Sequence, residues 1–180
     1  HLSLRRQRQM CIRDRGGLVN VAEMIATASK LGKRILVDPK GDDFARYAGA
    51  SVLTPNKSEL VRIVGQWKNE EDLTERAQKL RAELNLEALL LTRSEEGMSL
   101  YREGEVTHFP TMAREVFDVS GAGDTVIGTL AVMLGAGASL VDAVTMANRA
   151  GGIVVGKLGT ATVTREAVSY THLRAHETSL

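Results

Sequence analysis

The chain has 180 residues, of which 43% are hydrophobic and 25% charged, and its formal net charge is +1. This length is enough for one domain with a buried core, and the composition is ordinary for a globular protein. A single cysteine excludes a framework of disulfide bonds, and the longest apolar run, at 126–134, is too short to span a bilayer. We therefore expect a protein of the reducing cytoplasm that makes no membrane contact.

The hydrophobic spacing becomes regular at residue 17 and predicts helices that alternate with short apolar strands. Glycine and proline mark the ends of these stretches, as at Gly32 and Pro55. Two strand-like stretches flank the sequence REGE and predict an antiparallel hairpin. In chain order, we predict a helix at 18–32, strands at 33–38 and 50–54, helices at 56–65 and 69–85, a strand at 87–92, the hairpin at 97–111, and two helices that begin at SGAGD and at Ser139.

This alternation predicts the α/β class, with a mostly parallel sheet that helices cover on both faces. Such sheets bind ligands at the carboxyl ends of their strands. The three predicted parallel strands end in the sequences DPK, TPN and TRS, so each exit carries polar side chains. The sequence therefore predicts a polar site at one edge of the sheet.

The two ends of the chain, 1–15 and 169–180, lack the periodicity of the middle. Their composition fits a basic arm and a polar tail as well as unrelated sequence, but they resemble translated sequencing-adapter reads. We therefore expect both ends to be non-native and the domain to occupy 16–168. The ends contain six of the 23 basic and two of the 22 acidic residues, so the remaining net charge is −3. A basic nucleic-acid surface is not expected on such a domain.

The stretch TPNKSE allows two interpretations. Asn56 is a favourable residue before a helix, and Glu59 three positions later completes the spacing of a capping box. The same two residues follow a predicted strand, where they would face an anion and its magnesium ion. Glu59 would then hold Mg²⁺ through water, because this ion keeps much of its hydration shell. Both interpretations can hold together.

The stretch SGAGD precedes an apolar helix and suggests an anion site. The first turn of a helix has unpaired N–H groups and a partial positive charge, and small residues let an anion approach that backbone closely. Asp124 lies in this first turn, where its carboxylate reaches whatever binds at the helix end. A simple turn before a helix explains the glycines equally well. The spacing matches neither the Walker P-loop nor the dinucleotide-binding fingerprint.

Four motifs in order, NKSE, TRSEEG, DVSGAGDT and ANRAGGIVVGKLGT, resemble the C-terminal half of the ribokinase-type (PfkB) sugar kinases. The resemblance covers about 16–168 and implies the C-terminal part of a ribokinase-like three-layer α/β/α domain with a β-hairpin. It also implies catalytic roles for SGAGD. Asp124 would be the base that takes the proton from the acceptor hydroxyl, and Gly121, Ala122 and Gly123 would form the anion hole for the transferring phosphoryl group.

The resemblance further implies binding positions for ATP and for cations. The matching residues are Asn56, Lys57, Ser58 and Glu59 for the ATP phosphates and Mg²⁺, Thr92, Arg93 and Gly97 for the loop near the nucleotide, Asn148 for the helix beside the adenine, and Asp118, together with the loop around Gly159, for a monovalent cation such as K⁺.

Within the family, VDPKG, LTPNKSE, LLLTRSEEGMSL and GAGDTVIG are most similar to the bacterial kinases that phosphorylate C1 of D-glycero-β-D-manno-heptose 7-phosphate in ADP-heptose and lipopolysaccharide core synthesis. Such kinases begin with a portion that holds most sugar contacts and a β-lid, and we expect this chain to be a fragment without it. The alternatives are another PfkB sugar or nucleoside kinase, or an inactive nucleotide-binding fragment. A homodimeric parent and an attached adenylyltransferase domain are both left open.

Overall fold

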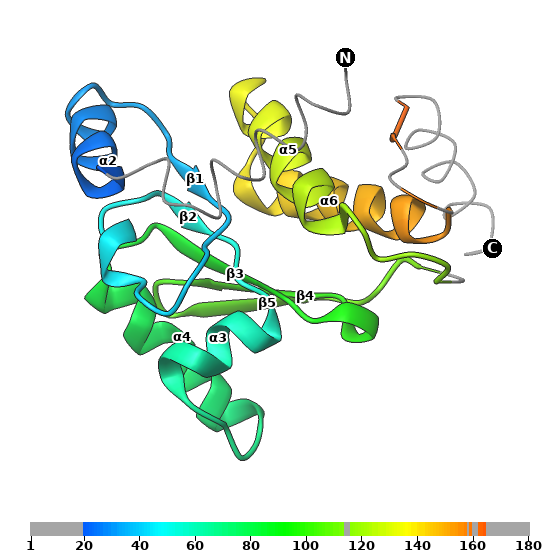
Figure 1. Cartoon of the computed structure of the whole chain (residues 1–180), viewed down its shortest axis with the longest axis horizontal. Coiled ribbons are helices and arrows are strands. Elements are labelled where there is room, and N and C mark those ends of the chain that lie inside the picture. The colour runs from blue at the N-terminus through cyan, green and yellow to red at the C-terminus, as the bar shows by residue number, and fades with distance from the viewer. Residues whose placement is uncertain (1–19, 114–115, 158, 160–161, 165–180) are drawn as a thin grey trace.

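A computed structural model describes residues 20–113, 116–157, 159 and 162–164 (Figure 1). The tails expected at 1–15 and 169–180 lie outside the described residues. The helices are α2 (Val21–Lys30), α3 (Lys57–Val64), α4 (Glu70–Glu83), α5 (Ala122–Gly135) and α6 (Leu140–Val155), with two 3₁₀ turns, η1 (Ala45–Tyr47) and η2 (Ser94–Glu96). No helix in this described part of the chain has the length and apolarity needed to cross a membrane.

The sheet has five strands in the order of the sequence: β1 (Leu36–Val37), β2 (Val52–Leu53), β3 (Ala88–Thr92), β4 (Met98–Arg102) and β5 (Glu105–Phe109). β1, β2 and β3 pair in parallel, whereas β4 pairs antiparallel with both β3 and β5. Four strands therefore run in one direction and β4 runs against them. This confirms the predicted α/β fold with a mostly parallel sheet and a hairpin.

Two hydrophobic clusters lie on opposite faces of the sheet. Leu89 and Leu91 of β3 contact the cluster that includes residues of α2, α3 and α4, whereas Ala88 and Leu90 contact the cluster that includes residues of α5 and α6. Figure 1 shows α3 and α4 on one side of the sheet and α5 and α6 on the other. A strand buried on both faces has no polar alternation, which explains the continuous apolar run ALLLT.

The helical periodicity of α4 is confirmed, because Leu73, Ala77 and Leu80 are all buried. The first two strands, however, are shorter than predicted: β1 and β2 have two residues each. Most of the difference lies at the start of each strand: β1 begins at Leu36 instead of residue 33, and β2 at Val52 instead of residue 50. The chain leaves the sheet just before Pro39 and Pro55, which cannot donate to a ladder, and the turns there form the edge at which the polar residues gather.

Candidate active site

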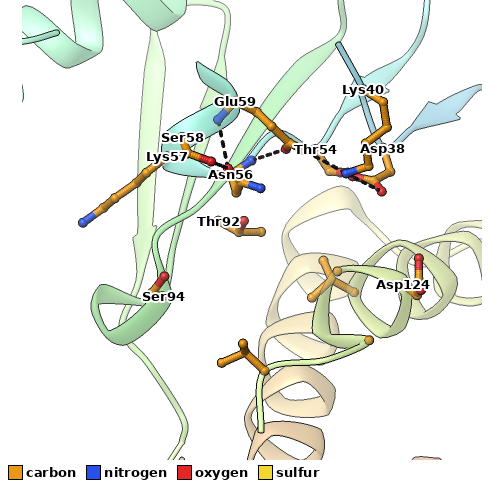
Figure 2. Close-up of a pocket in the computed structure, with 14 residues that line it drawn as sticks. Asp38, Lys40, Thr54, Asn56, Lys57, Ser58, Glu59, Thr92, Ser94 and Asp124 are labelled. Carbon is orange, nitrogen blue, oxygen red and sulfur yellow. Dashed lines mark hydrogen bonds and ion pairs between the residues drawn. The ribbon is translucent and has the colours of Figure 1, made fainter. Parts of the chain in front are cut away.

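A cavity of about 510 Å³ opens where β1, β2 and β3 end (Figure 2). It brings together the three polar strand exits, the start of α3 and the start of α5. Asn56, Glu59 and Asp124 thus share one cavity, as the sequence predicts for strand exits of a parallel sheet. The residues that line it are Asp38, Lys40, Thr54, Asn56, Lys57, Ser58, Glu59, Thr92, Ser94, Val119, Gly121, Gly123, Asp124 and Val126.

The start of α3 is a complete capping box. The Asn56 Oδ1 atom accepts a hydrogen bond from the Glu59 N–H at 2.9 Å, and Glu59 Oε2 accepts one from the Asn56 N–H at 2.9 Å. The Ser58 hydroxyl also donates to Asn56 Oδ1, at 2.7 Å. The capping interpretation is therefore confirmed. Because these bonds fix both side chains at the cavity wall, the cap also positions the polar groups that a ligand would meet.

Lys40 joins this group from the turn after β1, and sequence reasoning missed it as a site residue. Its Nζ lies 2.7 Å from Glu59 Oε1 and 3.2 Å from Asp38 Oδ2. Burial alone would lower the pKa of Lys40, but the hydrogen bond to Glu59 and the negative charges of Asp38 and Glu59 outweigh it, so the pKa is raised. The motif DPK marked a polar strand exit, yet nothing in the sequence indicated an ion pair between Lys40 and Glu59, which are 19 positions apart.

α5 begins without a side-chain cap. Asn56, Asn69 and Ser139 cap α3, α4 and α6, whereas in the described residues no side chain accepts a hydrogen bond at the start of α5. Its N-cap is Gly121, whose φ of 78° is in the left-handed region that glycine adopts without strain. The Ala122 N–H donates to the Val119 carbonyl oxygen at 3.2 Å, whereas the N–H groups of Gly121 and Gly123 remain available to an anion.

Asp124 is the third residue of α5, exposed at the cavity wall. Figure 2 shows it on α5, across from the group formed by Asn56, Ser58 and Glu59. A carboxylate in the first turn is favoured by the helix dipole. The arrangement thus places a potential proton acceptor beside a surface of uncapped N–H groups.

A second cavity, of about 400 Å³, adjoins the first and has a more apolar wall that includes Met98, Val116 and Val155. Gly97, Ala122 and Asn148, which the sequence singles out, also line it. Asn148 donates a hydrogen bond from Nδ2 to the Pro110 carbonyl oxygen at 2.8 Å. The two cavities have Thr92, Ser94, Val119, Gly123 and Val126 in common. A long ligand can therefore have a polar end in the first cavity and an apolar end in the second.

Gly97 has a steric reason to be glycine. A Cβ atom at this position would lie 2.0 Å from the Phe109 carbonyl oxygen, and φ is 87°. The close approach lets the end of η2 contact the end of β5. The glycine of TRSEEG therefore shapes the wall of the second cavity through backbone packing.

The Arg93 side chain does not line either cavity, although the family resemblance implies that it belongs to the loop near the nucleotide. It is only 9% exposed and donates to Glu70 Oε2 and Glu96 Oε2 at 2.8 Å each and to Ser99 Oγ at 3.1 Å. The hydrogen bond from Arg93 lowers the pKa of Glu70. Lys57 lines the first cavity, but its Nζ pairs with Glu96. Arg93 and Lys57 thus brace η2 against α4 and α3.

Asp118 connects two loops for which the family resemblance implies a monovalent-cation site. Its Oδ1 accepts a hydrogen bond from the Ser120 N–H at 2.8 Å, and its Oδ2 accepts one from the Gly159 N–H at 3.2 Å. The Ser120 hydrogen bonds, followed by that of Gly159, lower the pKa of Asp118. Neither Asp118 nor Gly159 lines the two cavities.

Comparison with curated proteins finds close relatives that are longer than this chain. It is 57% identical to the bifunctional protein HldE of Escherichia fergusonii over 150 residues, which are 83% of this chain and 31% of that protein. It is 56% identical to the D-beta-D-heptose 7-phosphate kinase of Bordetella bronchiseptica over 150 residues, again 83% of this chain but 48% of that protein. The chain therefore spans less than half the length of either relative.

Solved structures share the fold at lower identity. A ribokinase of Arabidopsis thaliana, complexed with ribose and ATP, superposes with a TM-score of 0.75 at 24% identity over 83% of this chain and 51% of its own. Phosphofructokinase-2 of Escherichia coli, in complex with substrates and products, superposes with a TM-score of 0.77 at 20% identity, over 87% of this chain and 52% of its own. The family model described as pfkB family carbohydrate kinase matches residues 17–167. This chain belongs to the pfkB family of carbohydrate kinases.

Proposed function

We propose that the chain is the phosphoryl-donor side of an ATP-dependent kinase that phosphorylates the C1 hydroxyl of D-glycero-β-D-manno-heptose 7-phosphate. The observation that carries the proposal is the cavity in which Asp124, beside the uncapped start of α5, lies across from Asn56 and Glu59. The choice of sugar is supported by 56% identity to a protein named as a heptose 7-phosphate kinase. A cytoplasmic role in ADP-heptose and lipopolysaccharide core synthesis follows from this substrate.

Asp124 acts as the general base in the proposed reaction. It accepts the proton of the C1 hydroxyl while that oxygen forms a bond to the γ-phosphorus of ATP. The bond between this phosphorus and the bridging oxygen breaks, and ADP leaves. The N–H groups at Gly121 and Gly123 donate to the oxygens of the transferring phosphoryl group, because no side chain of the described residues caps this helix. The Ala122 N–H, which was expected to join them, donates instead to the Val119 carbonyl oxygen.

The residues at α3 suit a magnesium ion that is held through water. Glu59 and Asn56 line the cavity with a carboxylate and an amide, and oxygen is the donor that Mg²⁺ takes. The described residues contain no cluster of three acidic or histidine side chains for direct coordination. Glu59 and Asn56 would therefore hold hydrated Mg²⁺ next to the ATP phosphates, where the ion neutralises phosphate charge. We assign a monovalent cation such as K⁺ to the loops joined by Asp118 and Gly159.

The second cavity receives the adenosine part of ATP in this proposal. Its apolar wall suits a base, and Asn148 is held at that wall by its bond to Pro110. The shared residues Thr92 and Ser94 then lie between the base and the phosphates. In this proposal the first cavity thus binds the phosphates and the second binds the adenosine of the same nucleotide.

The proposal is tested by joining the chain to the acceptor-side portion that precedes it in its relatives. The joined enzyme is expected to release ADP with D-glycero-β-D-manno-heptose 7-phosphate and to form a C1 phosphate, which ³¹P NMR identifies. The 180-residue chain alone is expected to bind MgATP weakly at most and to show no turnover, because it spans less than half the length of these relatives and the reaction requires water to be excluded around both substrates. Preference of the joined enzyme for ribose, fructose 6-phosphate or adenosine would contradict the heptose assignment.

A further inference from the structure

Tyr47 is a buried tyrosine that lines neither cavity, although its hydroxyl is bonded to a residue that lines the first. It is the last residue of η1 and is 6% exposed. Its ring packs edge-on against that of Phe44, with the centroids 6.0 Å apart, and the Arg46 guanidinium lies 5.5 Å from the ring centre. These contacts need only an aromatic ring, which phenylalanine would also supply. The hydroxyl group therefore needs a separate explanation.

The Tyr47 hydroxyl makes two hydrogen bonds, and both are to the backbone of Lys40. It accepts one from the Lys40 N–H at 3.1 Å and donates one to the Lys40 carbonyl oxygen at 3.0 Å. A phenolic hydroxyl can donate and accept at once, so the two bonds form together. Lys40 lies beyond Val37, the last residue of β1 that pairs with β2. The hydroxyl thus fixes the backbone of Lys40 at a point that the sheet does not reach.

The side chain of Lys40 carries this position to the wall of the first cavity. Its Nζ lies 2.7 Å from Glu59 Oε1 and 3.2 Å from Asp38 Oδ2, and Figure 2 shows Lys40 beside Asp38. The other carboxylate oxygen of Glu59 accepts the Asn56 N–H at 2.9 Å. A continuous series of hydrogen bonds therefore runs from the buried Tyr47 hydroxyl, through Lys40 and Glu59, to the start of α3.

We propose that Tyr47 is a positioning residue of the candidate active site, whose hydroxyl holds the Lys40 ammonium group and the Glu59 carboxylate in the geometry that receives magnesium and phosphate. The inference rests on the proposed function, because it takes the first cavity as the site of the ATP phosphates. Members of one hydrogen-bond network respond together when one of them moves. A tyrosine that only stabilised η1 would change the free energy of unfolding and leave the affinity for the nucleotide as it is.

The test compares Tyr47→Phe with the control Tyr101→Phe in the joined enzyme. Tyr101 is also buried and lines neither cavity. We expect Tyr47→Phe to weaken MgADP binding about two- to fivefold in calorimetry and to raise the KM for MgATP by a similar factor. Its kcat should stay within about twofold of the wild type, because Asp124 is not part of this series of bonds. Tyr101→Phe should leave MgADP binding unchanged, and unchanged binding by Tyr47→Phe would overturn the inference.

A double-mutant cycle with Lys40→Met shows whether the hydroxyl acts through Lys40. Once Lys40 has been replaced, its backbone no longer carries the ammonium group that binds Glu59. Tyr47→Phe should then cause no further loss of MgADP affinity, so that the effects of the two changes are not additive. A further loss as large as the one in the wild type would overturn the inference, because the hydroxyl would then act by a route that excludes Lys40.

Hydrogen exchange in the unmodified joined enzyme gives a second measurement, which does not depend on the folding of any variant. Saturating MgADP should slow the exchange of the Lys40 amide at least about tenfold, because nucleotide that binds the positioned pair opposes local opening of this turn. The Lys33 amide, which donates to Ala28 at the end of α2, should exchange at the same rate with and without MgADP. Equal exchange of the Lys40 amide in both states would contradict the inference. An unmodified joined enzyme that binds no MgADP would instead overturn the proposed function.

Discussion

Lys40 and Glu59 form an ion pair of 2.7 Å at the cavity wall, although Lys40 follows β1 and Glu59 lies in the first turn of α3, after β2. Glu59 uses its other carboxylate oxygen to cap α3, so its side chain links the start of α3 to the Lys40 ammonium group at the exit of β1. The Glu59 side chain is 11% exposed and that of Lys40 40% exposed. The pair therefore places positive charge at the cavity while it orients the helix cap.

Replacement of Lys40 by methionine is expected to destabilise the chain by about 1–2 kcal/mol, because Glu59 then remains largely buried without its cation. In the joined enzyme the same change should raise the KM for MgATP several-fold, because the cavity wall loses positive charge. Urea unfolding and initial-rate kinetics measure the two effects. Arg34→Met is the control, since Arg34 pairs with Glu87 on the exposed surface and should cost at most about 0.5 kcal/mol. Equal behaviour of the two variants would contradict the role of Lys40.

Asp124→Asn in the joined enzyme is expected to lower kcat by roughly 10³- to 10⁴-fold, because the amide cannot accept the acceptor proton. The affinity for MgATP should change little, since the N–H groups of α5 remain in place. Asp142→Asn is a matched control: Asp142 occupies the same position in the first turn of α6 but lies outside both cavities. Wild-type turnover by Asp124→Asn, measured as ADP release, would exclude Asp124 as the base.

Gly97→Ala is expected to destabilise the chain by about 2–5 kcal/mol, because the new methyl group meets the Phe109 carbonyl and the backbone is left-handed. Gly104→Ala separates the two causes. Gly104 has a φ of 66° but open space around a Cβ, so its variant should lose only about 1–2 kcal/mol. The difference between their urea midpoints measures the steric term. A Gly97→Ala chain as stable as Gly104→Ala would show that β5 yields to the methyl group.

Arg93→Met is expected to cost about 1–3 kcal/mol at pH 7, because one buried hydrogen bond to Ser99 is lost and two carboxylates lose their cation. The Arg93 hydrogen bond lowers the pKa of Glu70, and the Lys57 and Arg93 hydrogen bonds lower that of Glu96. These groups stabilise the fold above their unfolded pKa of 4.5 and lose that contribution as the pH falls through their folded values.

The stability difference between wild type and Arg93→Met should therefore shrink as the pH falls below 4.5. Chemical unfolding at a series of pH values measures it. Lys79→Met is the control, because Lys79 and Glu83 form an exposed pair whose loss is close to neutral. A difference that stays constant from pH 7 to pH 3 would mean that Arg93 acts through packing instead of charge.

The periodic elements were predictable from sequence because burial repeats along them. Leu73, Ala77 and Leu80 recur at helical spacing in α4, and the apolar run of β3 reflects burial on both faces. The clustering of Asn56 and Asp124 was predictable as well, because parallel strand exits meet at one edge. The fold and the place of the candidate site therefore follow from local patterns and one topological rule.

Other features depend on partners distant in sequence and were not predictable. The Arg93 side chain lies away from the cavity because it binds Glu70, 23 positions earlier. The Lys40 side chain lies at the cavity wall because it binds Glu59. The strand lengths of β1 and β2 were overestimated because an apolar run does not reveal where hydrogen bonding ends. The left-handed conformation of Ser94 has no sequence signal, since serine disfavours it.

The uncapped start of α5 implies thermodynamic linkage between nucleotide binding and the stability of the folded chain. An anion that accepts hydrogen bonds from the N–H groups at Gly121 and Gly123 does for α5 what Asn56 does for α3. A ligand that binds only the folded chain stabilises it in proportion to the logarithm of its concentration, by about 2.7 kcal/mol at one hundred times its Kd. Bound nucleotide phosphate would thus complete the N-terminal cap of α5, and the free energy of unfolding would rise with the nucleotide concentration.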